Sequence, residues 1–235
     1  MKLQKKRQGL QGVVYVPVRA FCEELEAEVG WTGECAEIKA EGLYMTVFPN
    51  ERYITANGRC LYAKDGCYIE NGLMMAPLRP IAESFGGKVV WNGKERSVYI
   101  EMSGETVKIG GEFYNQDDLY WLSRIIHAEA SGESLEGKIA VGNVVLNRVQ
   151  SPVFPDSIYE VIHDRRYGIQ FTPAWTGSIK RTPSEESIAA AKLCLEGVNT
   201  VGASLYFAGT KVAASSWAGK NRPFVARIGN HCFYA

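Results

Sequence analysis

The segments Gly12-Val13-Val14-Tyr15-Val16-Pro17-Val18-Arg19 and Gly72-Leu73-Met74-Met75-Ala76-Pro77-Leu78-Arg79 begin the same kind of unit twice, 60 positions apart. The same offset joins Trp31 to Trp91 and Gly33 to Gly93. A gapless match that includes two tryptophans indicates an internal repeat, and a repeat of this length predicts one supersecondary unit per copy.

Each copy predicts a strand, a helix and a hairpin. A short extended segment ends at the shared proline, and a helix follows with apolar residues four positions apart, Phe21 with Leu25 and Ile81 with Phe85. Such spacing places both side chains on one buried face. A strand through each tryptophan comes next, and in the second copy an Asn92-Gly93 turn leads into a further strand over 97–100.

Two β-rich runs over 52–55 and 66–69 lie between the copies and predict further strands. Cys60 and Cys67 flank an Asp65-Gly66 pair, which favours a hairpin with the two cysteines facing each other. The sequence leaves two alternatives open, a disulfide across that hairpin or two buried thiols.

Glycine-containing breaks over 103–116 separate this half from a second half with helical patterning, so we expect a domain boundary there. We predict an α+β protein, with the duplicated strand–helix–hairpin domain over 11–102 and a small, mainly helical domain over 117–235. Helices are expected over 117–130 with Asp117 as N-cap, over 134–150 and over 157–163. A fourth runs from the Thr182-Pro183 capping box to residue 197, and the aromatic tail from residue 204 is strand-like.

Composition excludes several classes of protein. The 235 residues are 46% hydrophobic and 22% charged, which excludes a disordered or collagen-like chain. Lys and Arg together number 26, as do Asp and Glu, so no global basic field supports binding to nucleic acid or to an anionic membrane. We expect no membrane span, because no run of 18 apolar residues occurs. The basic N-terminal segment has no apolar core, so no export signal is visible.

Residues 11–102, through the Pro-x-Arg starts and Trp-x-Gly ends of their repeats, resemble the copper amine oxidase N-terminal-like domain. The resemblance implies a non-catalytic module for attachment to the cell wall. Copper is not expected, because the first 102 residues contain no histidine and Cu(II) favours nitrogen ligands. Trp31 and Trp91 would stack on sugars or fill the core behind each hairpin, and their equivalent positions favour the core.

Glu129 is the candidate catalytic residue of the second half. It follows the apolar pair Ile125-Ile126 and lies between two alanines near the end of a predicted helix. A carboxyl group on a partly apolar face has a raised pKa, as a general acid for glycosidic cleavage requires. These features alone also fit a solvated glutamate.

The second half resembles the SleB-type cell wall hydrolases, which include spore cortex-lytic enzymes. The resemblance rests on ordered motifs that span most of residues 118–235, namely Ala128-Glu129-Ala130-Ser131-Gly132-Glu133, the segment 137–149, Ser151-Pro152-Val153-Phe154-Pro155, Gln170-Phe171-Thr172-Pro173, the segment 177–179, Leu205-Tyr206-Phe207, Ser216-Trp217 and the segment 225–231. It implies a minimal lysozyme-like fold that acts on peptidoglycan glycan strands.

The resemblance also implies site residues. Glu129 is the expected catalytic acid, with Glu133 as its rival, although Glu133 is suited to stabilise the start of the next helix. Gln170, Phe171 and Thr172 are expected beside the acid and Tyr206 in the cleft, as substrate-binding residues. The alternative is a structured loop with Phe171 in the core, and a core position for Tyr206. No metal or other cofactor is expected.

No second carboxylate has comparable motif support, since Asp156 and Asp164 read as capping residues. The sequence therefore favours a lytic transglycosylase, in which one glutamate suffices, over a hydrolase with two carboxylates. The substrate would be the bond between N-acetylmuramic acid and N-acetylglucosamine in vegetative wall or spore cortex, outside the cytoplasm. The alternatives are a non-enzymatic wall or spore-coat binding protein and, from the first domain's family name alone, a copper protein.

Overall fold

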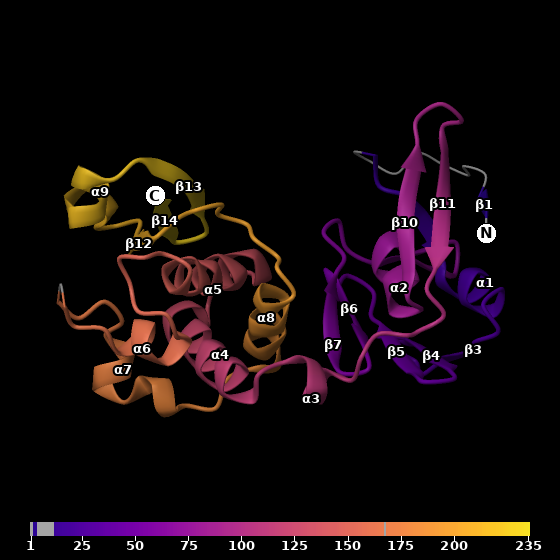
Figure 1. Ribbon diagram of the computed structural model, residues 1–235, viewed down its shortest axis with the longest axis horizontal. Coiled ribbons are helices and arrows are strands. Elements are labelled where there is room, and N and C mark those ends of the chain that lie inside the picture. The colour runs from indigo at the N-terminus through magenta and orange to yellow at the C-terminus, as the bar shows by residue number, and fades with distance from the viewer. Residues whose placement is uncertain (1, 4–11, 167) are drawn as a thin grey trace. The chain divides into compact units, whose positions relative to one another are not determined.

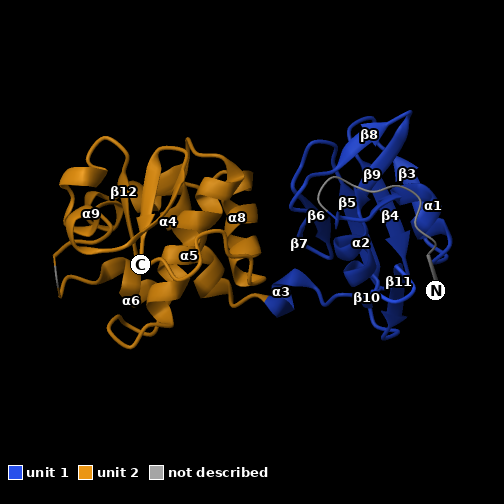
Figure 2. Cartoon of the chain, turned by 90° about the horizontal axis from the view of Figure 1, so that it is seen from above, with its two compact units in different colours: residues 1–113 blue, residues 114–235 orange. Residues whose placement is uncertain are grey.

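The structure is a computed structural model that describes residues 2–3, 12–166 and 168–235. It divides into two compact units, residues 1–113 and 114–235 (Figure 2). Residue 11, where the first domain is predicted to begin, lies outside the described residues. Among the described residues, no helix is both long and apolar enough to cross a membrane.

Unit 1 is mainly β-structure, and its described residues also form three short helices (Figure 1). Its elements are β1 (Lys2–Leu3), β2 (Tyr15–Pro17), α1 (Val18–Glu23), β3 (Glu28–Trp31), β4 (Ala36–Ala40), β5 (Leu43–Val47), β6 (Tyr53–Ala56), β7 (Arg59–Tyr62), β8 (Tyr68–Glu70), β9 (Leu73–Pro77), α2 (Leu78–Ser84), β10 (Gly87–Asn92), β11 (Ser97–Met102) and α3 (Gly110–Phe113). The strands form three antiparallel sheets in the orders β1-β11-β10, β2-β9-β8 and β3-β4-β5-β6-β7.

The repeat explains how unit 1 is built. Both copies contain the predicted strand, helix and hairpin, and the first strands of the two copies, β2 and β9, pair with each other. Val16 lies opposite Ala76 in that pair, and both side chains are buried. Phe21 and Ile81 occupy equivalent positions on α1 and α2 and enter the same core. The duplication therefore forms one shared core.

Two predictions for unit 1 are wrong. Cys60 on β7 and Cys67 just before β8 do not face each other across a hairpin, because β7 pairs with β6 whereas β8 pairs with β9. Cys67 is a buried free thiol. Trp31 and Trp91 do not fill the core either, being 47% and 55% exposed. Trp31 ends β3, two positions after the buried Val29, and Trp91 is the next-to-last residue of β10, opposite the buried Val98 of β11.

Unit 2 is helical with one small sheet. Its elements are α4 (Gln116–Ala130), α5 (Leu135–Val149), α6 (Ile158–His163), α7 (Pro173–Thr176), η2 (Ser178–Lys180), α8 (Glu185–Leu195), β12 (Tyr206–Gly209), η3 (Ala213–Ser215), α9 (Trp217–Asn221), β13 (Phe224–Ile228) and β14 (His231–Tyr234). The antiparallel sheet has the order β12-β14-β13. The two units together confirm the predicted α+β class.

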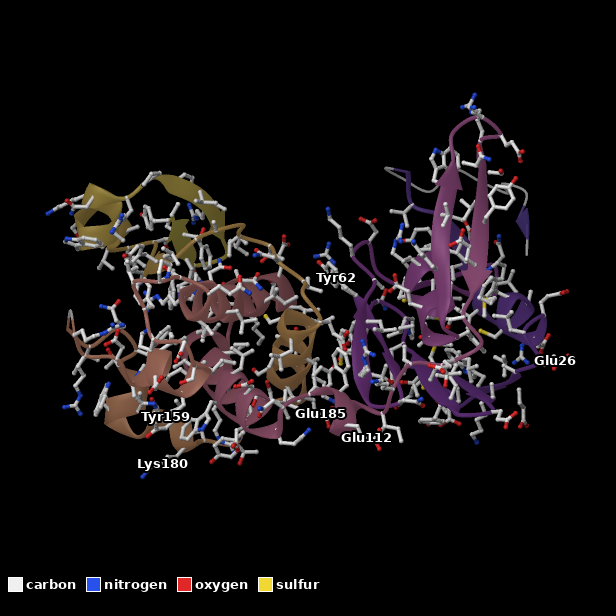
Figure 3. All side chains as sticks on the ribbon, in the orientation of Figure 1. Glu26, Tyr62, Glu112, Tyr159, Lys180 and Glu185 are labelled. Carbon is white, nitrogen blue, oxygen red and sulfur yellow. The ribbon has the colours of Figure 1, made fainter. Side chains whose placement is uncertain are left out.

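Helices α4, α5 and α8 pack around a shared core, with side chains filling the space between them and Tyr159 and Lys180 at the periphery (Figure 3). Gly142 on α5 permits this close approach. A Cβ there would lie 2.6 Å from Sγ of Cys194 on α8 and 2.8 Å from Cδ1 of Ile126 on α4. This packing holds the last turn of α4, which carries Glu129, in place.

Helix starts agree with the predictions in part. Ser134 and Ser157 cap α5 and α6, each accepting a backbone hydrogen bond through its hydroxyl group. Asp117 is not the N-cap of α4, because the side chain of Asn115 accepts the N–H groups of residues 117 and 118. Ser184 caps α8, so Pro183 lies before the helix and not at its first position. The short helices α7 and α9 were not predicted.

Candidate active site

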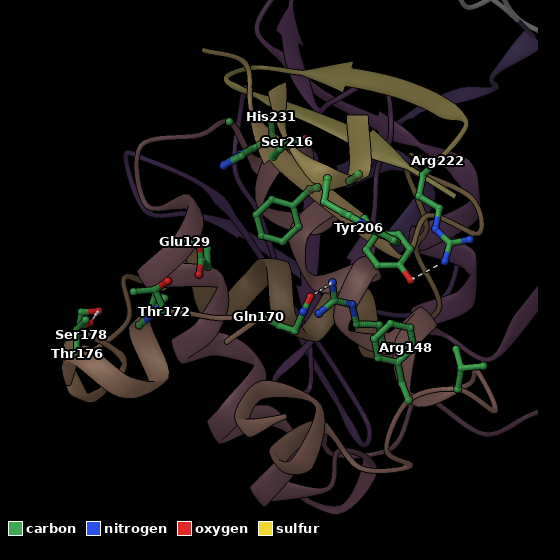
Figure 4. A pocket seen from close by; sticks show the side chains of 18 residues that line it. Glu129, Arg148, Gln170, Thr172, Thr176, Ser178, Tyr206, Ser216, Arg222 and His231 are labelled. Carbon is green, nitrogen blue, oxygen red and sulfur yellow. Dashed lines mark hydrogen bonds between the residues drawn. The ribbon is translucent and has the colours of Figure 1, made fainter. Parts of the chain in front are cut away.

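The predicted acid lies in a cavity of about 1060 Å³ within unit 2 (Figure 4). Helix α4, the loop after α6, helix α7, strand β12 and helix α9 all contribute to the wall. The polar and charged lining residues are Glu129, Arg148, Gln170, Thr172, Thr176, Ser178, Tyr206, Ser216, Arg222 and His231, and the others include Val153, Phe154, Pro173, Phe207 and Trp217.

Among the described residues, Glu129 is the only acidic one that lines the cavity. Its carboxyl group is half-buried and makes no hydrogen bond or ion pair with another described residue. Burial raises the pKa of Glu129 from about 4.5 to about 7, because water no longer solvates the charged form. Near neutral pH a large fraction of Glu129 is therefore protonated and able to donate a proton into the cavity.

Glu133 occupies a different position. Its carboxylate accepts hydrogen bonds from the backbone N–H of Asn230 at 3.1 Å and from Nδ2 of the same residue at 2.9 Å. Partial burial raises the pKa of Glu133, but these bonds and the nearby charges of His231 and Lys138 outweigh it and leave the pKa below its usual value. Glu133 is therefore ionised and holds the turn between β13 and β14, where Gly229 has a φ of +54°.

This arrangement predicts a structural effect for Glu133→Ala. Loss of two hydrogen bonds to a charged group should lower the free energy of unfolding by about 2 kcal/mol. We expect the thermal midpoint to fall, while fragment release from cell wall at low temperature persists at a reduced rate. Glu133→Gln, which keeps one acceptor oxygen, should be affected less. Complete loss of activity in a folded Glu133→Ala protein would contradict the structural role.

The other predicted residues separate into two groups. Gln170, Thr172 and Tyr206 line the cavity with Glu129. Phe171 does not, since it is 0% exposed and packs in the core near Phe207, with ring centroids 6.2 Å apart. The prediction that Phe171 binds substrate is therefore wrong, because alternation along the loop turns its ring inward while its two neighbours line the cavity.

Arg148 fixes the orientation of Gln170. The guanidinium group has only donors, so its Nη2 must face the side-chain oxygen of Gln170, which lies 3.3 Å away. The amide nitrogen of Gln170 makes no hydrogen bond with a described residue. Arg148 itself is 3% exposed and donates through Nε to the backbone oxygen of Leu205 at 2.7 Å. Burial lowers the pKa of Arg148 to about 10, so it remains a cation at neutral pH.

The lining residues that were not among the predicted site residues include Arg148, Trp217, Arg222 and His231. Arg148, Trp217 and His231 all fall inside the quoted motifs, so the motif matches themselves were the available signal. Arg222 had none, because only the folding of α9 against β12 brings it beside Tyr206. Burial lowers the pKa of His231, although the charge of Glu133 opposes this, and its Nδ1 is buried without a partner.

A copper ion does not fit unit 1. That unit contains no histidine, and no group of three or more His, Cys, Asp or Glu residues occurs in the described part of the chain that could hold a metal.

Comparison with known proteins agrees with both halves of the sequence analysis. Residues 132–234 match the cell wall hydrolase family, beginning three positions after Glu129, and residues 1–100 match the copper amine oxidase N-terminal domain. The spore cortex-lytic enzymes of Halalkalibacterium halodurans and Bacillus subtilis are 35% and 33% identical over 120 residues. These stretches cover 51% of this chain but only 35% and 38% of the relatives. The chain thus matches well under half the length of those two relatives.

A shorter relative is matched over most of its length. The cell wall hydrolase CwlJ of Bacillus subtilis is 30% identical over 121 residues, which are 50% of this chain and 84% of the relative. The solved catalytic domain of the germination-specific lytic transglycosylase SleB from Bacillus anthracis is 32% identical, with a TM-score of 0.47, 55% of this chain covered and 100% of that chain.

A carboxyl group with a pKa of about 7, the only one among the described residues to line a cavity with aromatic and cationic walls, is the arrangement that a general acid requires. The match to CwlJ, at 30% identity over 84% of that protein, shows the family. The chain belongs to the cell wall hydrolase family.

Proposed function

We propose that this chain cleaves the glycan strand of peptidoglycan between N-acetylmuramic acid and N-acetylglucosamine, as a lytic transglycosylase with Glu129 as its catalytic acid. The observation that carries the proposal is that no carboxyl group other than that of Glu129 lines the cavity in the part of the chain that the structure describes. Asp164 is paired with Arg166 at 3.0 Å, and neither it nor Asp156 lines the cavity. The relatives named as spore cortex-lytic enzymes support the substrate class.

One carboxyl group suffices for this reaction. Glu129 donates its proton to the bridging oxygen as the bond from that oxygen to C1 of the muramic acid breaks. The resulting carboxylate then accepts the proton of the 6-hydroxyl group of the same sugar, while the hydroxyl oxygen forms a new bond to C1. The products are a 1,6-anhydromuramic end and a free 4-hydroxyl group on the neighbouring sugar, and Glu129 regains its proton. A hydrolase with two carboxylates would need a second acid in the wall.

Fragment release tests the proposal. Purified sacculi incubated with the chain should release soluble muropeptides, whereas heat-denatured protein should release none. Vegetative sacculi and spore cortex should be compared, because the proposal places the substrate outside the cytoplasm without choosing between them. Binding to both walls without any release would instead favour the non-enzymatic wall-binding alternative.

We also propose that unit 1 attaches the protein to the wall through its two exposed tryptophans. Trp31→Ala combined with Trp91→Ala should weaken binding to sacculi about tenfold, if each ring contributes roughly 0.7 kcal/mol. The measurement is the fraction of protein that sediments with sacculi, made with Glu129→Gln throughout so that the wall stays intact. Ile69→Ala, which removes another exposed apolar side chain of unit 1, is the matched control. Equal binding of the double variant and the control would contradict this role.

A further inference from the structure

Three residues form one end of the cavity, which we call the Arg222 end: Tyr206, Trp217 and Arg222. The rings of Tyr206 and Trp217 have centroids 5.4 Å apart. The guanidinium carbon of Arg222 lies 5.0 Å from the ring centre of Tyr206 and 5.2 Å from that of Trp217. Its Nη2 donates to the hydroxyl oxygen of Tyr206 at 3.3 Å. Figure 4 shows Glu129 and Arg222 at opposite sides of the cavity.

The Arg222 end is accessible to a ligand. Trp217 is 58% exposed, and Arg222 is also exposed. An exposed tryptophan face that lines a cavity offers an apolar surface on which a pyranose ring packs. The cation beside it adds a donor of fixed position, because the hydrogen bond to Tyr206 and the contacts with both rings orient the guanidinium group.

The charge around this end is unbalanced. Arg148 lies behind Tyr206, with its guanidinium carbon 5.6 Å from that ring centre, and its Nη1 is buried without a hydrogen-bond partner among the described residues. Neither Arg148 nor Arg222 forms an ion pair with a described residue. Asp164, whose charge acts on Arg148, is committed to Arg166 at 3.0 Å. Glu129, the only described acidic residue in the wall, lies at the other side of the cavity. Two cations therefore face this end without a counter-ion.

We propose that the Arg222 end is a subsite for a muramic acid residue that carries a free carboxylate, with the sugar ring on Trp217 and the carboxylate on Arg222. The proposal rests on the proposed function and deepens it, because it specifies which muramic residues the cavity prefers. N-acetylglucosamine has no carboxylate. A muramic acid has one on its lactyl group or on the amino acid attached there, and loses it when that group closes into a lactam.

Binding measurements test the subsite without any catalytic step. The protein is the full chain with Glu129→Gln, and the ligands are the N-acetylglucosaminyl–N-acetylmuramic acid disaccharide and its methylamide. We expect the carboxylate form to bind about five- to tenfold more tightly at low ionic strength, and the preference to shrink at high salt. Adding Arg222→Met should bring the ratio of the two dissociation constants close to one, and Arg222→Lys should retain part of it.

Lys220→Met is the matched control. Lys220 is exposed, lies on the same helix α9 and does not line the cavity, so its loss removes one charge without changing the subsite. The ratio of the two dissociation constants in Lys220→Met should equal that of the parent protein. An equally strong preference in Arg222→Met and in the parent, or no preference in the parent, would overturn the subsite.

Wall digestion separates failure of the subsite from failure of the proposed function. Native sacculi and sacculi with amidated carboxylates are digested by the chain with Glu129 intact. If fragments are released but the ratio of the two dissociation constants is the same with and without Arg222, the subsite is wrong and the proposed function holds. If no wall releases fragments but the ratio of the two dissociation constants depends on Arg222, the proposed function is wrong and the subsite for a sugar with a carboxylate holds.

Discussion

Glu129→Gln should reduce the release of soluble fragments from peptidoglycan by roughly 10²- to 10⁴-fold, the range that a positioned general acid contributes. Glutamine has nearly the same shape but no acidic proton, so binding to the wall should persist. The measurement compares initial rates of fragment release with the amount of protein bound to the same sacculi. Glu129→Asp keeps a carboxyl group but on a side chain shorter by one methylene group, and it should retain more activity than Glu129→Gln. Full activity in Glu129→Gln would contradict its catalytic role.

The pH dependence has a definite sign. Because burial raises the pKa of Glu129 to about 7, the protonated form that donates the proton is lost as the pH rises through that value. The rate of fragment release should therefore fall above about pH 7. A rate that rises steadily from pH 6 to pH 8 would mean that the charged form of Glu129 is the active one.

Glu129→Gln should also raise the stability of the folded chain at alkaline pH. An unfolded chain releases the proton of Glu129 near pH 4.5, whereas the folded chain holds it to about pH 7, so the folded state loses stability as the pH rises between these values. Glu129→Gln removes this loss. Its thermal midpoint should exceed that of the unsubstituted chain at about pH 8, and the two should converge at about pH 4.

Phe171→Ala should lower the free energy of unfolding of unit 2 by about 3–5 kcal/mol, the usual cost of emptying a buried phenylalanine site. The ring is fully buried, 6.2 Å from Phe207 and 5.1 Å from the guanidinium carbon of Arg148. Its loss leaves a cavity beneath the loop that presents Gln170 and Thr172. Urea unfolding followed by circular dichroism measures the effect.

Phe171→Leu, which keeps most of the apolar volume, is the control and should cost roughly 1 kcal/mol. The two alternatives for Phe171 have different signatures. A core residue changes the unfolding midpoint, whereas a substrate-binding residue changes the concentration of substrate needed for half-maximal rate. A Phe171→Ala protein with unchanged stability and weakened binding of glycan would contradict the core position.

Local patterns predicted most elements. The 60-residue repeat predicted the strand, helix and hairpin of each copy, apolar periodicity predicted α4 and α5, and the capping box predicted α8. The predictions were wrong where contacts between segments distant in sequence determine the structure. Cys60 and Cys67 look like a hairpin pair locally, but β7 is the edge of one sheet and β8 of another. The tryptophans match in both repeats, yet their side chains are exposed, outside the core that the two repeats share.

The site was predictable to the extent that the motifs contain it. Glu129, Gln170, Thr172 and Tyr206 all line the cavity, although their roles remain proposals. Arg222 could not be predicted, because neither its neighbours in sequence nor its spacing indicates that it meets Tyr206. The position of Glu133 likewise depends on a distant residue, Asn230, which engages the carboxylate with two hydrogen bonds.

Mass spectrometry of the fragments released from sacculi tests the central claim most directly. Because Glu129 alone among the described residues brings a carboxyl group to the cavity wall, we expect muropeptides that end in 1,6-anhydromuramic acid, produced by the chain with Glu129 and not by Glu129→Gln. Vegetative and cortex sacculi should be digested side by side. Fragments that carry only reducing muramic acid ends would contradict the transglycosylase mechanism and require a water molecule as the attacking group.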